Sequence, residues 1–114
     1  MAGKLGTEKL FENDQVEVWN FELAPGEETE MHTHERAYMW YCIQGGTLTV
    51  VDENDNDVGS LGSVKAGDVY SFKVEDGDIV VLTEPSKGVR FPARHKARNI
   101  GATTYREVMV EYKQ

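Results

Sequence analysis

Turn-forming residues interrupt this sequence at short intervals, and that spacing constrains the fold more than any other feature. No apolar stripe with helical spacing persists beyond about two turns of helix. The segments between the turns are rich in β-branched and aromatic residues, which suit a half-buried pleated sheet. We therefore predict an all-β fold. The expected strands span residues 15–23, 30–34, 38–43, 47–51, 69–74, 78–83, 88–91, 95–99 and 105–112.

Short strands of this kind need to close into a barrel or pair as two sheets, because an open sheet leaves unpaired edges. The chain has 114 residues, which is near the usual size of one domain. We predict a single domain over residues 1–114, with a small antiparallel barrel or sandwich over 15–112 and an N-terminal arm over 1–12. Residues 1–10 are expected to fray or to form one short helix or an edge strand.

Charge and cysteine content exclude several classes of partner. The formal net charge of −8 opposes binding to nucleic acid, whose affinity for proteins comes from a concentrated basic surface. The longest aliphatic run, residues 79–82, is far shorter than the roughly 20 residues that cross a bilayer, so no membrane partner is expected. Cys42 is a single cysteine, and the first ten residues lack the apolar stretch of a signal peptide. We predict a cytoplasmic protein.

The three histidines are the strongest functional signal. His32 and His34 are two residues apart in a predicted strand, so their side chains project from the same face. His95 lies in another predicted strand. Three imidazoles with open coordination positions are typical of a catalytic metal site. A His-x-His pair alone is a weak signal, because two surface histidines on an edge strand have the same spacing.

The residues around the histidines match the spacing of a known pair of motifs. The first cupin motif, G-x5-H-x-H-x3,4-E-x6-G, is reproduced by Gly26, His32, His34, Tyr38 and Gly45, with tyrosine in place of the glutamate. The end of the second motif is similar to Pro92, His95 and Asn99, and residues 67–68 resemble its opening. The sequence thus resembles a small single-domain cupin of the conserved-barrel type.

The resemblance implies an antiparallel jelly-roll barrel, also called a double-stranded β-helix, with a metal near its mouth. The implied metal ligands are His32, His34 and His95. The stretch from Gly67 to His95 is longer than the compact second motif of the family, so we expect an extra hairpin inserted around residues 73–90. An added hairpin can cap the barrel or form the edge of a dimer, and a homodimer is expected.

Replacement of the family glutamate by Tyr38 changes the expected chemistry. A phenol with a pKa of about 10 seldom binds a metal, so Tyr38 is predicted to be catalytic as a hydrogen-bond donor or an acid/base, with a packed barrel residue as the alternative. Trp40 shares its strand face and is predicted to bind substrate. Arg36 lies in the turn before Tyr38 and is a candidate to hold a substrate carboxylate. Glu30 is either a substitute ligand, an orienting residue or a solvated side chain.

Basic residues gather next to the third histidine, in an otherwise acidic protein. Five of them lie between residues 87 and 98: Lys87, Arg90, Arg94, Lys96 and Arg98. If His95 points inward, strand alternation sends Arg94, Lys96 and Arg98 outward. We therefore expect this stripe on the outer face, solvated or paired with the carboxylates of a partner, and consider an anion-binding rim the second alternative.

Two function classes follow from these residues. The first is a small-molecule metalloenzyme with one divalent transition metal, for which iron is favoured and zinc, nickel and manganese are alternatives. Iron would give dioxygenase-type chemistry, whereas the other ions would give lyase, isomerase or hydrolase chemistry. Its ligand would be a small molecule, with anionic compounds included. The alternative is a non-catalytic module that binds a metabolite or a metal.

Overall fold

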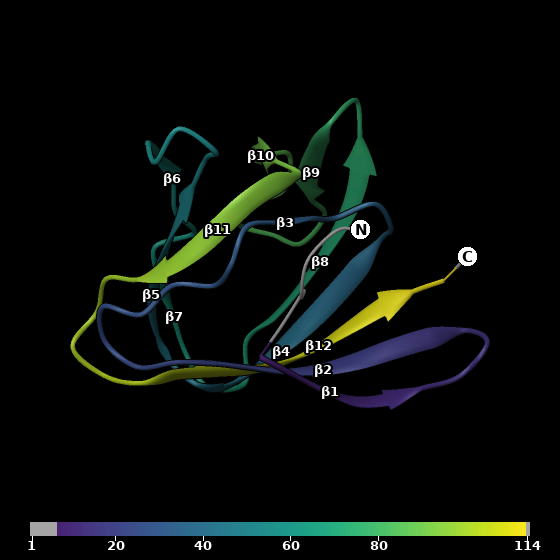
Figure 1. Ribbon diagram of the computed structural model, residues 1–114, viewed down its shortest axis with the longest axis horizontal. Coiled ribbons are helices and arrows are strands. Elements are labelled where there is room, and N and C mark those ends of the chain that lie inside the picture. Colours follow the sequence, from purple (N-terminus) through teal and green to yellow (C-terminus); the bar gives the residue numbers. More distant parts are fainter. Residues whose placement is uncertain (1–6, 114) are drawn as a thin grey trace.

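The computed structural model describes residues 7–113, and all regular structure in that range is β-strand (Figure 1). The strands are β1 (Glu8–Glu12), β2 (Val16–Leu23), β3 (His32–Thr33), β4 (Tyr38–Gln44), β5 (Gly46–Val51), β6 (Asp57–Gly59), β7 (Ser63–Val64), β8 (Val69–Glu75), β9 (Asp78–Val81), β10 (Arg90–Pro92), β11 (Arg94–Asn99) and β12 (Tyr105–Tyr112). No helix long and apolar enough to cross a membrane occurs among the described residues.

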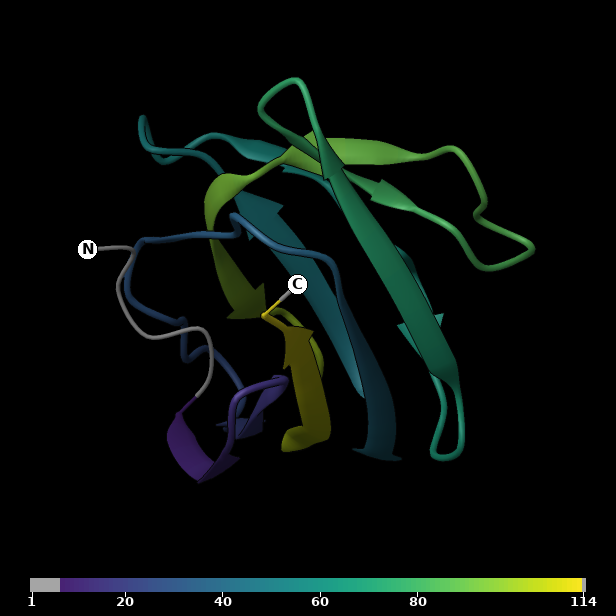
Figure 2. The same cartoon turned by 90° about the vertical axis from the view of Figure 1, so that its right-hand side faces the viewer.

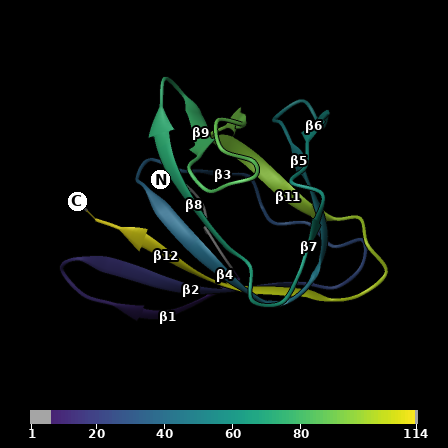
Figure 3. The ribbon, with the colours of Figure 1, turned by 180° about the vertical axis from the view of Figure 1, so that it is seen from behind.

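The strands form two antiparallel sheets that enclose the core. The larger sheet has the order β1-β2-β12-β4-β8-β9-β10. The smaller sheet has the order β3-β11-β5-β6, and β7 lies beside β5, as the view from behind shows (Figure 3). The all-β fold class is therefore confirmed, and the strands close on each other as the double-stranded β-helix requires.

Alternation along the central strands decides which side chains fill the interior. In β12 every second residue is buried, beginning with Tyr105 and ending with Glu111. In β4 the buried residues are Tyr38, Trp40 and Cys42, whereas Tyr41 and Ile43 face solvent. Because side chains of successive strand residues point to opposite faces, both strands present one face to the core.

Most predicted strands have counterparts at nearly the expected positions, with three differences. The predicted strand over 30–34 is reduced to the two residues of β3, because the chain there runs along the rim and pairs only with β11. β6 and β7 were not predicted, since each has too few residues to show alternation. Within the N-terminal arm, β1 is an edge strand of the larger sheet, and residues 1–6 lie outside the described residues.

The hairpin expected around residues 73–90 is formed by β8 and β9. It begins at Val69, and its strands pair from Phe72 with Val81 to Glu75 with Asp78. The hairpin extends the larger sheet, and Phe72 and Ile79 are buried in the core. The segment between β9 and β10 projects from the body of the molecule (Figure 2).

Three residues of the recognised motifs have structural roles. Gly26 has a φ of 84°, a left-handed conformation that favours glycine. A Cβ atom at Gly45 would overlap the carbonyl oxygen of Val64, so a side chain is sterically excluded there. The buried Asn99 amide donates to the carbonyl oxygens of Leu23 and Thr103, at 2.9 Å each. They lie together at the Asn99 end of β11, whereas His95 is near the other end of that strand.

Candidate metal centre

The two sheet segments that carry the histidines are adjacent. His32 in β3 lies directly opposite His95 in the antiparallel ladder with β11. His34 follows β3, and its backbone N–H donates to the carbonyl of Ala93 at 2.9 Å. All three histidines are buried, with exposed fractions of 5% or less. Residues sixty positions apart in the sequence are thus fixed in one cluster by backbone hydrogen bonds.

The three imidazoles converge in the interior. One nitrogen of each ring lies within 4.8 Å of one nitrogen of each of the others. The ring centroids are 4.7 Å apart for His32 and His95, 4.9 Å for His32 and His34, and 5.1 Å for His34 and His95. Two nitrogens at about 2.1 Å from one ion are at most about 4.2 Å apart, so a small approach of the rings would complete a ligand set. Three buried histidines could therefore hold a metal ion.

Hydrogen bonds to the backbone decide which ring nitrogen of His32 and of His95 is free to bind a metal. Nδ1 of His32 lies 3.0 Å from the carbonyl oxygen of Glu30, and Nδ1 of His95 lies 2.7 Å from that of Pro92. A carbonyl oxygen only accepts, so Nδ1 carries the proton in both rings and Nε2 keeps its lone pair. The backbone thus prepares the tautomer that a metal ligand requires.

Burial keeps the cluster uncharged. Desolvation lowers the pKa of His32, and it lowers the pKa of His95 to about 4, with the neighbouring His32 adding to the effect. Desolvation, together with His95 and His32, holds the pKa of His34 well below its ordinary value. All three rings are therefore neutral at pH 7, which is the form that binds metals.

His34 supplies an independent sign that the cluster fits a metal. Its Nδ1 is buried and has no hydrogen-bond partner. Buried polar atoms without a partner are rare in proteins and usually mark a functional group or a missing ion. The ring also stacks on Tyr38, with centroids 4.2 Å apart and planes 13° from parallel. The donor set and this unsatisfied nitrogen both suit a bound cation.

A cavity of about 80 Å³ opens beside the histidines. This is several times the roughly 10–15 Å³ that one water needs, so the cavity has room for a small ligand. Its walls are mainly apolar and aromatic, and they come from both sheets. The ionisable side chains in the lining are the three histidines, Tyr38, Tyr105 and Glu107.

The predicted substrate-contacting residues are divided between the cavity and the surface. Tyr38 and Trp40 are buried and line the cavity, and Trp40 stacks on Tyr70 at a centroid distance of 4.7 Å. Arg36 does not line the cavity. Its guanidinium is half-exposed and pairs with Glu111 at 3.3 Å.

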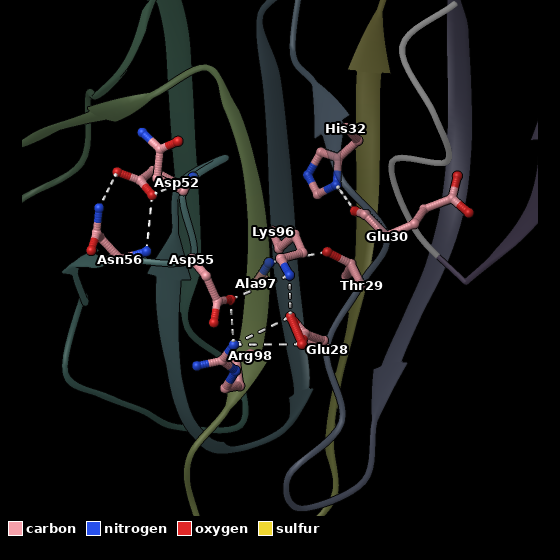
Figure 4. Close-up of polar contacts among 11 residues, drawn as sticks. Glu28, Thr29, Glu30, His32, Asp52, Asp55, Asn56, Lys96, Ala97 and Arg98 are labelled. Atoms are coloured by element: carbon pink, nitrogen blue, oxygen red, sulfur yellow. Dashed lines mark hydrogen bonds and ion pairs between the residues drawn. The ribbon is translucent and has the colours of Figure 1, made fainter.

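Glu30 orients a histidine through its backbone. Its carbonyl oxygen accepts the His32 Nδ1 proton, whereas its exposed side chain is directed away from the ring (Figure 4). The carboxylate is outside the three-histidine cluster. The contact that orients the imidazole comes from the Glu30 backbone, whereas the roles expected from the sequence were for its carboxylate.

The basic stripe lies on the outer face and is paired with carboxylates of the same chain. Lys96 approaches Glu28 at 2.9 Å, and Arg98 approaches Glu28 at 3.4 Å and Asp55 at 3.1 Å (Figure 4). Arg94 pairs in the same way with Glu53 at 3.2 Å. The outward orientation expected from strand alternation is confirmed, and these cations are not part of the cavity lining.

Sequence reasoning missed a second polar group in the cavity. Glu107 is 3% exposed, and the Tyr105 hydroxyl donates to its Oε1 at 2.6 Å. Burial raises the pKa of Glu107 to about 8. The available signal was strand alternation, because Glu107 has the same parity as Tyr105 and Met109 in the last predicted strand.

Solved structures confirm the fold that the motifs imply. A cupin domain from Bordetella pertussis has a TM-score of 0.60 and 21% identity, and the match covers 98% of this chain and 100% of that one. A double-stranded β-helix cupin from Methanocaldococcus jannaschii has a TM-score of 0.55 and 18% identity over 92% of this chain and 76% of that one. This chain has the fold of a small cupin.

An enzyme is among the similar structures. The polyketide cyclase RemF from Streptomyces resistomycificus has a TM-score of 0.53 and 18% identity, over 93% of this chain and 63% of that one. At the level of sequence, no protein-family model and no curated protein matches this chain. The comparisons therefore define the fold, and the site has to be interpreted from its own residues.

Proposed function

We propose that this protein is a metal-dependent enzyme acting on a small molecule, with one divalent transition metal held by His32, His34 and His95. The observation that carries the proposal is the convergence of three neutral imidazoles in the lining of a mainly apolar cavity. A divalent ion bound there supplies Lewis acidity, and iron also supplies oxygen chemistry. The fold supports the proposal, since RemF, of similar fold, is a cyclase.

Iron is the favoured metal, with dioxygenase-type chemistry, and zinc, nickel or manganese would indicate lyase, isomerase or hydrolase chemistry. Imidazole binds all of these ions. Among the residues that line the cavity, the only carboxylate is Glu107, and it is hydrogen-bonded to Tyr105. Three neutral ligands leave the charge of a dication uncompensated, which favours substrates that carry oxygen donors.

Tyr38 is proposed to assist as a hydrogen-bond donor. Burial, with Glu107 and Glu111 nearby, raises the pKa of its phenol well above the ordinary value. The phenol therefore keeps its proton at neutral pH and cannot serve as a base there. Stacked between His34 and Phe72, it is held rigidly beside the cluster. Trp40 forms part of the cavity wall against which the substrate would pack.

Arg36 has a different role in this proposal. Its pair with Glu111 closes the end of the barrel near Tyr38, since Glu111 and Tyr38 are paired residues of β12 and β4. A carboxylate-bearing substrate would have to displace Glu111 to reach the guanidinium. A homodimer and a cytoplasmic location, both expected from the sequence, belong to the same proposal.

Elemental analysis tests the metal directly. Protein purified without oxygen or chelator should contain about one divalent transition metal per chain. Iron would indicate oxygen chemistry, and zinc or nickel would indicate acid/base chemistry. A tightly held metal with no turnover of any oxygen-bearing compound would instead favour the binding module.

Replacement of His34 supplies the matched variant. His34→Ala should lose the stoichiometric metal while its circular dichroism spectrum stays that of a folded β-protein. Thr33→Ala is the control, because Thr33 is adjacent but has the opposite strand parity and contacts Arg94 outside the cavity. Full retention of metal in the His34 variant would refute the assignment.

A further inference from the structure

Glu107 is a buried carboxyl group that metal binding does not require. It lies on the inward face of β12 and lines the same cavity as the three histidines. In the interior, the hydroxyl of Tyr105 donates a hydrogen bond to its Oε1 at 2.6 Å. The described lining of the cavity contains no lysine or arginine, and Arg36 pairs with Glu111 instead. Glu107 therefore has no cationic side chain in the cavity lining to compensate a buried carboxylate.

The carboxyl group is held in its acid form. Burial raises its pKa to about 8, and the Tyr105 hydrogen bond offsets this only partly. The other titratable groups near it are Tyr105 in β12 and Tyr38 and Cys42 in β4, and burial raises the pKa of each of them. All of these groups are neutral at pH 7. With Tyr105 donating to Oε1, the acid proton is held on Oε2, from which it is available for a hydrogen bond to a ligand.

We propose that Glu107 is a ligand-recognition residue whose carboxylic acid donates a hydrogen bond to a carbonyl or hydroxyl oxygen of a neutral small molecule in the cavity. This proposal rests on the proposed function, because the ligand has to lie beside the histidines. The cavity walls are mainly apolar, so the body of the ligand is apolar. No lysine or arginine lines the cavity in the described chain, so an anionic group at the Glu107 end would be buried without a partner.

Cyclohexanone is a suitable probe, with cyclohexane as an isosteric hydrocarbon that lacks the acceptor oxygen. Binding is measured from amide NMR shifts of the full chain. Glu107→Leu should weaken cyclohexanone binding about five-fold, the size expected for one hydrogen bond, and should leave cyclohexane binding unchanged. Glu107→Gln should retain most of the affinity, because the amide also donates. An equal loss of affinity for both probes in Glu107→Leu would overturn the proposal. The absence of saturable cyclohexanone binding to the wild type would also overturn it.

Infrared spectroscopy provides a second readout, which is recorded on the wild type and uses Glu107→Gln only to assign the band. At pH 7 the cyclohexanone-induced difference spectrum of the wild type should contain a shifted carbonyl band of a protonated carboxylic acid. The band should be absent from the spectrum of Glu107→Gln, which assigns it. A spectrum that shows only ionised carboxylate, or an acid band that does not respond to cyclohexanone, would contradict the proposal.

Different measurements would refute the metal proposal and the Glu107 recognition proposal. Wild-type protein with one metal per chain and an ionised Glu107 would retain the metal proposal and overturn the recognition role. Protein without metal whose protonated Glu107 binds cyclohexanone would do the reverse. Metal content is therefore measured on the same samples used for NMR and infrared spectroscopy.

Discussion

Burial shifts the pKa values of the histidines and of Glu107, which all face the cavity, in opposite directions. It lowers the pKa of each histidine, because the charged imidazole is a cation, and raises that of Glu107, because the charged carboxyl group is an anion. Both effects leave the groups neutral at pH 7. The residues can then perform different tasks in one cavity, since neutral imidazoles accept a metal and a neutral acid donates a hydrogen bond.

The raised pKa of Glu107 predicts a pH dependence of stability. The folded state keeps the Glu107 proton up to about pH 8, whereas the unfolded chain releases it near its ordinary value of 4.5. The stabilising contribution is therefore complete below pH 4.5 and is lost as pH rises through 8. The free energy of unfolding of the wild type should fall by roughly 3–4 kcal/mol relative to that of Glu107→Gln between pH 5 and pH 8. Parallel urea-denaturation curves of the two proteins across that range would contradict this.

Prediction from the sequence succeeded for residues that belong to a spaced motif and failed for Glu107. The three histidines were predicted as a cluster, and the structure brings them together. Glu107 lies in no motif, and an acidic residue in a strand is usually solvent-exposed. Its burial depends on the register of β12 between β2 and β4, which the sequence does not specify.

Among the elements, β11 shows most clearly how strand alternation places the candidate metal ligand on the inward face and the basic side chains on the outward face. Its inward face carries His95 and Asn99, and its outward face carries Lys96 and Arg98 in ion pairs with Glu28 and Asp55. Exposed pairs of this kind contribute little to stability. The inward residues are therefore the candidate ligand, His95, and Asn99, whose contacts hold the turn into β12.

Asn99 is expected to stabilise that turn strongly. Its amide donates to Leu23 and Thr103, and its Oδ1 accepts the Gly101 N–H at 2.9 Å. Asn99→Ala removes all three bonds, including the buried one to the carbonyl of Leu23, so it should cost about 2–4 kcal/mol in thermal or urea unfolding. Ile100→Ala is the control, because Ile100 is exposed on the same turn. An effect no larger than that of the control would contradict this role.

Strands were predictable where alternation extended over several residues, as in β4, β8 and β12. The two-residue strands β3 and β7 form because neighbouring strands supply backbone partners, and a short segment cannot show that in advance. The β8–β9 hairpin was expected from its turn residues, and its left-handed Asp76 and Gly77 explain that success. The place of the hairpin in the larger sheet depends on pairing with strands that are distant in the sequence, which the hairpin's own residues do not determine.

At the scale of the whole molecule, the outer face of the larger sheet carries an exposed apolar patch. Tyr41 and Ile43 of β4 and Val69 of β8 are exposed, and Tyr41 is paired directly with Val69. The outward residues of β4 carry no charge, so two copies of an acidic chain could meet there without opposing carboxylates. We expect the homodimer to form through this face.

Charge insertion tests the dimer. The wild type should be dimeric in light scattering coupled to size-exclusion chromatography, and Tyr41→Glu should be monomeric with unchanged metal content. Val58→Glu, which places the same charge at an exposed apolar residue of the smaller sheet, should remain dimeric. A monomeric wild type, or a dimeric Tyr41 variant, would show that this face is not the interface.

The central claim is that His32, His34 and His95 bind one metal ion at the cavity. The most direct measurement is an anomalous difference map from crystals of protein purified without oxygen or chelator, recorded at the absorption edge of the metal found by elemental analysis. A single strong peak is expected at about 2.0–2.3 Å from one nitrogen of each of the three imidazoles. A map with no peak among these rings, or with its metal bound elsewhere on the chain, would contradict it.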